Sequence, residues 1–252
     1  MRILVHLTAE ALPGRDGERL DTLARSVAAL IEAGHEIAVT TAGPAEDAVA
    51  TGSRLVRALT DVLPGRSVAA LLTHAEVRAH DPALLQPASH VDGSADDAGP
   101  ITTLRPYAVL EAPAVRDLLA CSTLPVCAAG PAVIREPGTG RLRTVQRTAN
   151  PERTAVVLAE YLDTDLLLFL TGATHLFAPR SHGHPRPLLR VTPQELADVR
   201  MPEGARVVAD AAAAYVTRTE AMAAVGPADN ALGIVRETTG TLVRRARTAR
   251  PA

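Results

Sequence analysis

Short apolar stretches alternate with helical patterns along most of this 252-residue chain, and that alternation constrains the fold more than any other feature. Strands are predicted at residues 2–7, 35–43, 124–130 and 165–171. Helices are predicted at residues 17–33, 45–61, 112–120, 151–162 and 203–224. Such alternation favours an α/β protein, in which helices cover both faces of one sheet.

The remaining segments give weaker signals. Residues 67–73 are ambiguous between helix and strand, and residues 133–145 predict a β-hairpin around a glycine-containing turn. Residues 80–103 and 178–187 are expected to be surface loops because proline, glycine and polar residues dominate them. Thr192 is the expected N-cap of a further helix. Two final strands are predicted at residues 231–237 and 240–245.

Composition excludes several classes of function. The formal net charge of −2 gives no electrostatic support for binding nucleic acid. No apolar run reaches the roughly 20 residues needed to span a bilayer. The first strand has neither the length nor the flanks of a secretory signal, so a cytoplasmic protein is expected. Cys121 and Cys127 form no metal-binding pattern and are expected to be buried free thiols.

Every basic residue in the chain is arginine, and there is no lysine. A general bias toward arginine can remove surface lysines harmlessly. It cannot harmlessly replace a lysine on which a reaction depends, because arginine differs in shape, reach and hydration.

Polar and small residues follow four of the predicted strands. Ligands of parallel α/β sheets bind outside the carboxyl ends of the strands. The candidate site segments are therefore "TAEAL" (8–12), "TAGP" (41–44), "AAGP" (128–131) and "TGATH" (171–175).

Eight fragments, in order, resemble the motifs of the amino acid kinase superfamily, and of carbamate kinases most closely. Three of them are "TAEAL" opposite the family's "GGNAL", "TTAGPAE" (40–46) opposite "THGNGPQ", and "FLTGATHLF" (169–177) opposite "ILTDVD.VY". The others are "RPYAVLEAPAVRDLLACSTLPVCAAGPAVIRE" (105–136), "TVQRTANPE" (144–152), "LLRVTPQEL" (188–196), "RMPEGARVVADAAA" (200–213) and "ALGIVRETTGTLV" (231–243). The likeness is poorest over residues 62–104, a loop-rich region.

The resemblance implies a single domain over residues 1–252 with a three-layer α/β/α amino acid kinase fold. It also implies ATP with Mg²⁺ as cofactor, a small carbamate- or carboxylate-type acceptor, and a homodimer. The motif positions suggest these roles: catalysis for Arg206, Arg147 and Glu10; substrate binding for Thr8, Ala9, Gly43, Pro44 and Gly130; nucleotide binding for Thr171, Gly172, Thr174 and His175. No metal site is expected, since His182 and His184 have no evident third ligand.

The departures from the motifs fall on the residues that do the family's chemistry. Thr8 and Ala9 replace two glycines that let backbone N–H groups approach a phosphate, and Glu10 places a carboxylate beside it. Gly172 and Thr174 replace two aspartates. Two functions stay open: a divergent ATP-dependent phosphotransferase, or a catalytically silent or repurposed relative that binds a small molecule or regulates a partner.

Overall fold

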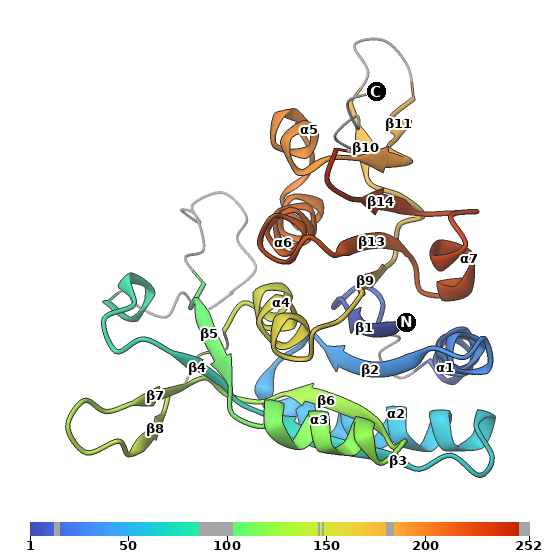
Figure 1. Cartoon of the computed structure of the whole chain (residues 1–252). Helices are drawn as coiled ribbons and strands as arrows, with labels where there is room; N and C mark the ends of the chain where they lie inside the picture. Colours follow the sequence, from blue (N-terminus) through green and yellow to red (C-terminus); the bar gives the residue numbers. More distant parts are fainter. Residues whose placement is uncertain (13–15, 86–102, 146, 148, 180–183, 247–252) are drawn as a thin grey trace, which may run out of the picture.

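The computed structural model describes residues 1–12, 16–85, 103–145, 147, 149–179 and 184–246. An eight-stranded sheet forms its centre (Figure 1), in the order β12-β14-β13-β9-β1-β2-β6-β3. The strands are β1 (Arg2–Leu7), β2 (Glu36–Thr41), β3 (Val68–Thr73), β6 (Leu124–Ala129), β9 (Leu166–Thr171), β12 (Arg190–Val191), β13 (Met222–Pro227) and β14 (Thr241–Val243). All pair in parallel except β13 with β14.

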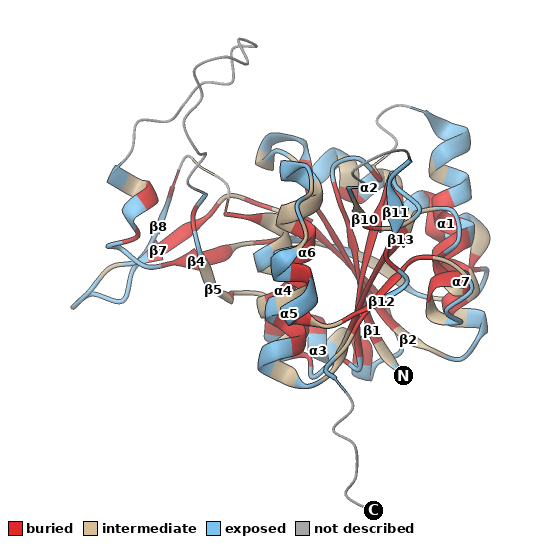
Figure 2. Ribbon diagram, turned by 90° about the horizontal axis from the view of Figure 1, so that it is seen from above, coloured by how far each residue is buried: buried red, intermediate tan, exposed pale blue. Residues whose placement is uncertain are grey.

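Helices cover both faces of this sheet, as the view from above shows (Figure 2). One face carries α1 (Gly17–Glu32), α2 (Ala48–Val62) and α7 (Ala231–Val235). The other carries α3 (Ala112–Ala120), α4 (Pro151–Tyr161), α5 (Pro193–Asp198) and α6 (Glu203–Thr219). This is the three-layer α/β/α arrangement expected from the sequence. Among the described residues, no helix combines the length and the apolar character needed to cross a bilayer.

Smaller elements lie beside the main sheet. A four-stranded sheet has the order β5-β4-β7-β8, and a two-stranded ribbon joins β10 to β11. Their bounds are β4 (Ala75–Val77), β5 (Pro106–Val109), β7 (Val133–Arg135), β8 (Leu142–Thr144), β10 (Phe177–Ala178) and β11 (Arg186–Pro187). Two short 3-10 helices, η1 (Ala45–Asp47) and η2 (Pro82–Leu85), complete the described elements.

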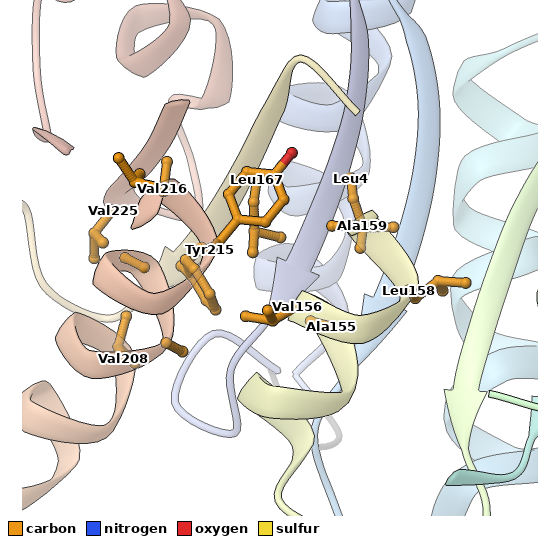
Figure 3. Close-up of a cluster of buried hydrophobic side chains, with 14 of the residues drawn as sticks. Leu4, Ala155, Val156, Leu158, Ala159, Leu167, Val208, Tyr215, Val216 and Val225 are labelled. Atoms are coloured by element: carbon orange, nitrogen blue, oxygen red, sulfur yellow. The ribbon is translucent and has the colours of Figure 1, made fainter. Parts of the chain in front are cut away.

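The core on the α4–α6 face is built from aliphatic side chains around two buried rings, those of Phe169 and Tyr215. Tyr215 of α6 is fully buried, and Figure 3 shows it among side chains of α4, β1 and β9. Its hydroxyl is 2.8 Å from Thr164 Oγ1 and also donates to the Thr164 carbonyl. A buried tyrosine needs such partners because an unpaired hydroxyl in an apolar core costs free energy.

Most predicted elements are confirmed to within about two residues. The ambiguous segment 67–73 is strand β3, and the predicted hairpin at 133–145 is the antiparallel pair β7–β8. Thr192 is an N-cap whose hydroxyl accepts from the Glu195 amide, within a full capping box. Parts of both predicted loops, residues 86–102 and 180–183, lie outside the described residues.

Two predictions at the carboxyl end of the chain are wrong. The helix predicted at 203–224 ends at Thr219, and the following residues form the interior strand β13. The strand predicted at 231–237 is helix α7. β13 is made of small residues because α7 packs closely on it: a Cβ at Gly226 would lie 2.6 Å from Ile234 Cδ1. Close packing overrides alanine's preference for helix here.

The cysteines also differ from expectation, because only Cys127 is buried and Cys121 is exposed. Burial, together with the nearby Glu111 carboxylate, raises the pKa of the Cys127 thiol to about 12.

Since the thiolate is the reactive form, we expect Ellman's reagent at pH 8 to modify one thiol in the native protein and both thiols in urea. Cys121→Ser should abolish the native reaction, and rapid modification of both thiols in the folded protein would contradict the prediction.

Candidate functional site

The carboxyl ends of the parallel strands meet at one edge of the main sheet, and two cavities lie there. Cavity A, about 910 Å³, lies beside the ends of β1 and β9 and the start of α6. Its lining comprises Thr8, Ala9, Glu10, Glu152, Thr171, Ala173, His175, Leu176, Phe177, Ala178, Pro179, Pro185, Arg200, Met201, Pro202, Gly204, Ala205, Val208 and Val225. Cavity B, about 650 Å³, lies beside the ends of β1, β2 and β6. The two cavities share Ala9 as a lining residue, so they adjoin at the loop after β1.

The loop after β1 is folded back on the sheet. Thr8 is buried, and both its amide and its hydroxyl donate to the Leu170 carbonyl of β9, each at 3.1 Å. The Thr8 carbonyl in turn accepts from the amides of Ala11 and Leu12. The Thr8 amide is therefore used within the fold, whereas the exposed Ala9 lies at the junction of the cavities.

Glu10 is an exposed lining residue of cavity A, and its carboxylate lies near two glycines. A Cβ at Gly172 would lie 3.6 Å from its Oε2, and a Cβ at Gly204 would lie 3.9 Å from its Oε1. Gly204 lies in the first turn of α6, where unpaired backbone N–H groups and the helix dipole favour negative charge. The Glu10 carboxylate therefore lies close to the point where this helix would attract an anionic ligand.

The two arginines suggested for catalysis do not meet at the cavities. The guanidinium of Arg206 donates to the carbonyls of Leu196 and Val199 at the end of α5 and lies 3.2 Å from Asp210 Oδ1. Arg147 donates to the carbonyl of Ala83 in η2. Neither arginine lines cavity A or cavity B.

The residues suggested for substrate binding are divided between a cavity and the sheet. Gly43 and Pro44 line cavity B, and Gly43 has a φ of 132°, a conformation that favours glycine. Gly130 lines neither cavity. Its amide donates to the Thr73 carbonyl at 2.8 Å, and an added Cβ would lie 2.9 Å from that oxygen. Gly130 thus permits the close approach of β6 to β3.

The turn after β9 holds the four residues suggested for nucleotide binding. Thr171 and His175 line cavity A. Gly172 lines a separate hollow of about 330 Å³ with residues of α1, and the exposed Thr174 lines neither cavity. The Thr171 hydroxyl donates to the Ala173 carbonyl at 3.0 Å, so this hydroxyl stabilises the turn after β9.

A buried pair that the sequence analysis did not identify lies beside cavity A. His6 of β1 is fully buried, with Nδ1 at 2.9 Å from Thr40 Oγ1 and Nε2 at 4.0 Å from Glu152 Oε1. Glu152, in the first turn of α4, is itself a lining residue of the cavity. A histidine within the otherwise apolar stretch "ILVHL" (3–7) is the one sequence signal that could have indicated this pair.

The pKa of Glu152 reflects two opposing effects. Burial raises it, but the neighbouring His6 ring and the residue's own backbone amide lower it, and the net shift is downward. Glu152 is therefore ionised at neutral pH. Among the described residues, no group of three or more His, Cys, Asp and Glu side chains could hold a metal ion, and His182 lies outside them.

Comparisons with known proteins agree with this architecture. Residues 1–225 match the sequence profile of the amino acid kinase family. Carbamate kinase from Giardia lamblia bound to AMP-PNP has a TM-score of 0.83 at 15% identity, over 97% of this chain and 98% of that one. A protein from Aeropyrum pernix K1 has a TM-score of 0.83 at 19% identity, over 98% and 100%.

A larger protein contains the same fold as a part. N-acetylglutamate synthase from Neisseria gonorrhoeae, complexed with coenzyme A and L-arginine, has a TM-score of 0.66 at 14% identity. The match covers 97% of this chain and 61% of the synthase. With the profile match over most of the sequence and the carbamate kinase-like arrangement of strands and helices, this chain belongs to the amino acid kinase family.

Proposed function

We propose that this family member binds a small organic molecule at the carboxyl ends of its strands and does not transfer phosphate from ATP. The observation that carries the proposal is the position of Glu10, whose carboxylate lies between Gly172 and the first turn of α6. In effect, the protein supplies its own anion where the helix would favour a bound one.

Electrostatics make a triphosphate a poor fit to this set of side chains. A carboxylate and a phosphate oxygen 4 Å apart repel by about 1 kcal/mol in water and by about 4 kcal/mol at an effective dielectric constant near 20. Glu152 adds a second carboxylate to the same cavity. Among the described lining residues of cavity A, Arg200 is the one arginine and is exposed, and His175 is the one other side chain that can carry a positive charge.

The arginine suggested for phosphate binding has another use. Arg206 holds the carboxyl end of α5 through two backbone carbonyls. Releasing Arg206 for a phosphate would cost the Val199 carbonyl its guanidinium donor and leave the Leu196 carbonyl only the Val199 amide at 3.3 Å, and this loss opposes the movement. Cavity A therefore has few of the positively charged side chains that stabilise a phosphoryl group during transfer.

The second candidate is phosphoryl transfer from ATP with Mg²⁺ to a carbamate- or carboxylate-type acceptor. It is favoured by the two adjoining cavities, since a two-substrate reaction needs neighbouring compartments that meet at one point. Ala9 would then be the junction at which the phosphoryl group crosses, and Gly43 and Pro44 would face the acceptor.

Thermal unfolding with Mg-ATP separates the two candidates. A ligand present at 100 times its Kd adds about 2.7 kcal/mol to stability, and each kcal/mol raises Tm by roughly 2–4 °C for a chain of this size. We expect millimolar Mg-ATP to leave Tm unchanged and to yield no ADP with carbamate or acetate as acceptor. A rise in Tm of about 5 °C, or ADP formation that depends on the acceptor, would establish the second candidate instead.

Glu10→Gln then tests whether the Glu10 carboxylate is what prevents Mg-ATP from binding. This change removes the charge and keeps the size, so it should allow measurable binding of Mg-ATP or of inorganic triphosphate. Glu203→Gln is the matched control, because Glu203 is also in the first turn of α6 but does not line cavity A. If both variants behave like the unmodified protein, Glu10 is not what keeps the polyphosphate out.

A further inference from the structure

Cavity A combines an apolar wall with two carboxylates. Leu176, Phe177, Met201, Val208 and Val225 supply the wall. A ligand that fills such a space gains free energy from the apolar surface it buries, and the few polar groups decide its orientation. The charged groups that can orient a ligand in cavity A are the two carboxylates and the exposed Arg200.

Glu152 is the more buried of these two carboxylates. Its side chain is 12% exposed, whereas Glu10 is an exposed residue. The amino end of α4 stabilises the negative charge of Glu152 through the helix dipole. The His6 ring and the backbone amide of Glu152 already offset the cost of burying its charge, and a ligand that supplies a cationic donor adds a further charge-assisted hydrogen bond.

The His6 ring is near Glu152 but does not line cavity A, and two contacts fix its position. Thr40 contacts Nδ1, and the Phe169 ring packs edge-on with its centroid 5.6 Å from that of His6. Among the described residues the buried Nε2 has no hydrogen-bond partner, and it lies 4.0 Å from Glu152 Oε1, beyond hydrogen-bond length. His6 therefore restricts where the carboxylate can move but leaves its hydrogen-bonding capacity available to a ligand.

We propose that cavity A binds an organic molecule that carries a primary ammonium group on an apolar body. The ammonium group donates to the Glu152 carboxylate, and Glu10 adds a second negative charge near the opening. The apolar body packs against Phe177, Met201 and Val208. This inference rests on the proposed function, because it assigns to cavity A a ligand other than nucleotide phosphates.

Three probes of nearly equal shape test the charge preference: phenethylamine, phenethyl alcohol and phenylacetate. A hydrogen bond to a charged group is worth about 1.5–3 kcal/mol, which corresponds to roughly a 10- to 100-fold difference in Kd. We expect calorimetric titration to show that phenethylamine binds at least about 10-fold more tightly than the alcohol, and that phenylacetate binds most weakly. Tightest binding of phenylacetate, or no binding of any probe at millimolar concentration, would overturn the proposal.

Variants locate the effect. Glu152→Gln should remove the preference for the amine and leave the affinity for the alcohol unchanged, while Glu203→Gln should change neither. If Glu152→Gln does not fold, Glu152→Asp keeps the charge on a shorter side chain and should weaken only amine binding. An amine preference that is unchanged in Glu152→Gln would contradict the assignment of Glu152. If only Glu152→Asp folds, unchanged amine affinity in that variant would contradict it.

His6 is a positioning residue in this scheme, and its test must differ from a test of stability. His6→Gln should reduce amine affinity relative to alcohol affinity. If His6 is purely structural, the variant should weaken the binding of both probes equally, and that result would exclude the positioning role. Mg-ATP provides the remaining distinction. If it binds and displaces phenethylamine, the proposed function fails and the amine site stands; if neither binds, only the amine site fails.

Discussion

Replacing Phe169 by alanine is expected to lower the free energy of unfolding by about 3–5 kcal/mol, the usual cost of removing a fully buried aromatic ring. Phe169 is 0% exposed in β9, at the centre of the main sheet, and its ring packs edge-on against His6. The substitution removes the apolar contacts and leaves a cavity that the surrounding strands cannot close. Urea unfolding, with the midpoint and slope both measured, gives the change directly.

The second phenylalanine of the chain supplies a matched control. Phe177 is only partly buried, at the wall of cavity A, so Phe177→Ala should cost less than half as much as Phe169→Ala. Phe169→Leu should cost about 1 kcal/mol because it keeps most of the apolar volume. Equal losses from the two alanine variants would mean that Phe169 does not occupy the core as described.

Most of the fold could be predicted from sequence because its strongest elements carry local signals. The run "LLLFLT" of β9 is apolar at every position but the last, and α1 has an Asp16 N-cap before its amphipathic pattern. Both signals come from neighbouring residues alone, so no knowledge of the tertiary structure is needed to read them. The order of such elements was enough to predict the three-layer architecture.

The strand β13 could not be predicted because its small residues are required by the helices that pack on both faces of the sheet, and not by a local strand pattern. Ala223 and Ala224 are good helix formers, but their small size lets helices approach the sheet on both faces. Gly226 meets Ile234 of α7 for the same reason. Since α6 directly precedes these residues, the local pattern extends the helix through the strand.

The location of the candidate site was more predictable than its side chains. Parallel strands end at one edge, so the segments containing Thr8, Gly43 and Thr171 were predicted to meet there, and each lines a cavity. Which way an arginine points depends on tertiary contacts, and Arg206 turns toward α5. His6 and Glu152 lie on elements far apart in the chain, so no local spacing connects them.

Replacing Glu76 by glutamine is expected to cost about 2 kcal/mol, because it weakens charge-assisted hydrogen bonds to a carboxylate that is almost fully buried. Glu76 of β4 accepts from Arg135 Nε at 2.9 Å and Nη2 at 3.1 Å, and from the Tyr107 hydroxyl. Burial raises the pKa of Glu76, but these hydrogen bonds lower the pKa by more than burial raises it, and the net shift is downward. A carboxyl with a lowered pKa stabilises the folded state fully above its ordinary value of 4.5 and loses that contribution as the pH falls through the lowered value.

The difference in stability between the unmodified protein and Glu76→Gln should therefore be constant near neutral pH and shrink below about pH 4.5. Urea unfolding from pH 7 down into the acid range measures it, with the exposed Glu46→Gln of η1 as the control that changes neither quantity. Because β4 joins β5 to β7, the loss at Glu76 weakens the four-stranded sheet at its interior pair. A difference that grows toward acid pH would mean that the carboxyl is protonated in the folded state, and that Arg135 and Tyr107 do not hold its charge.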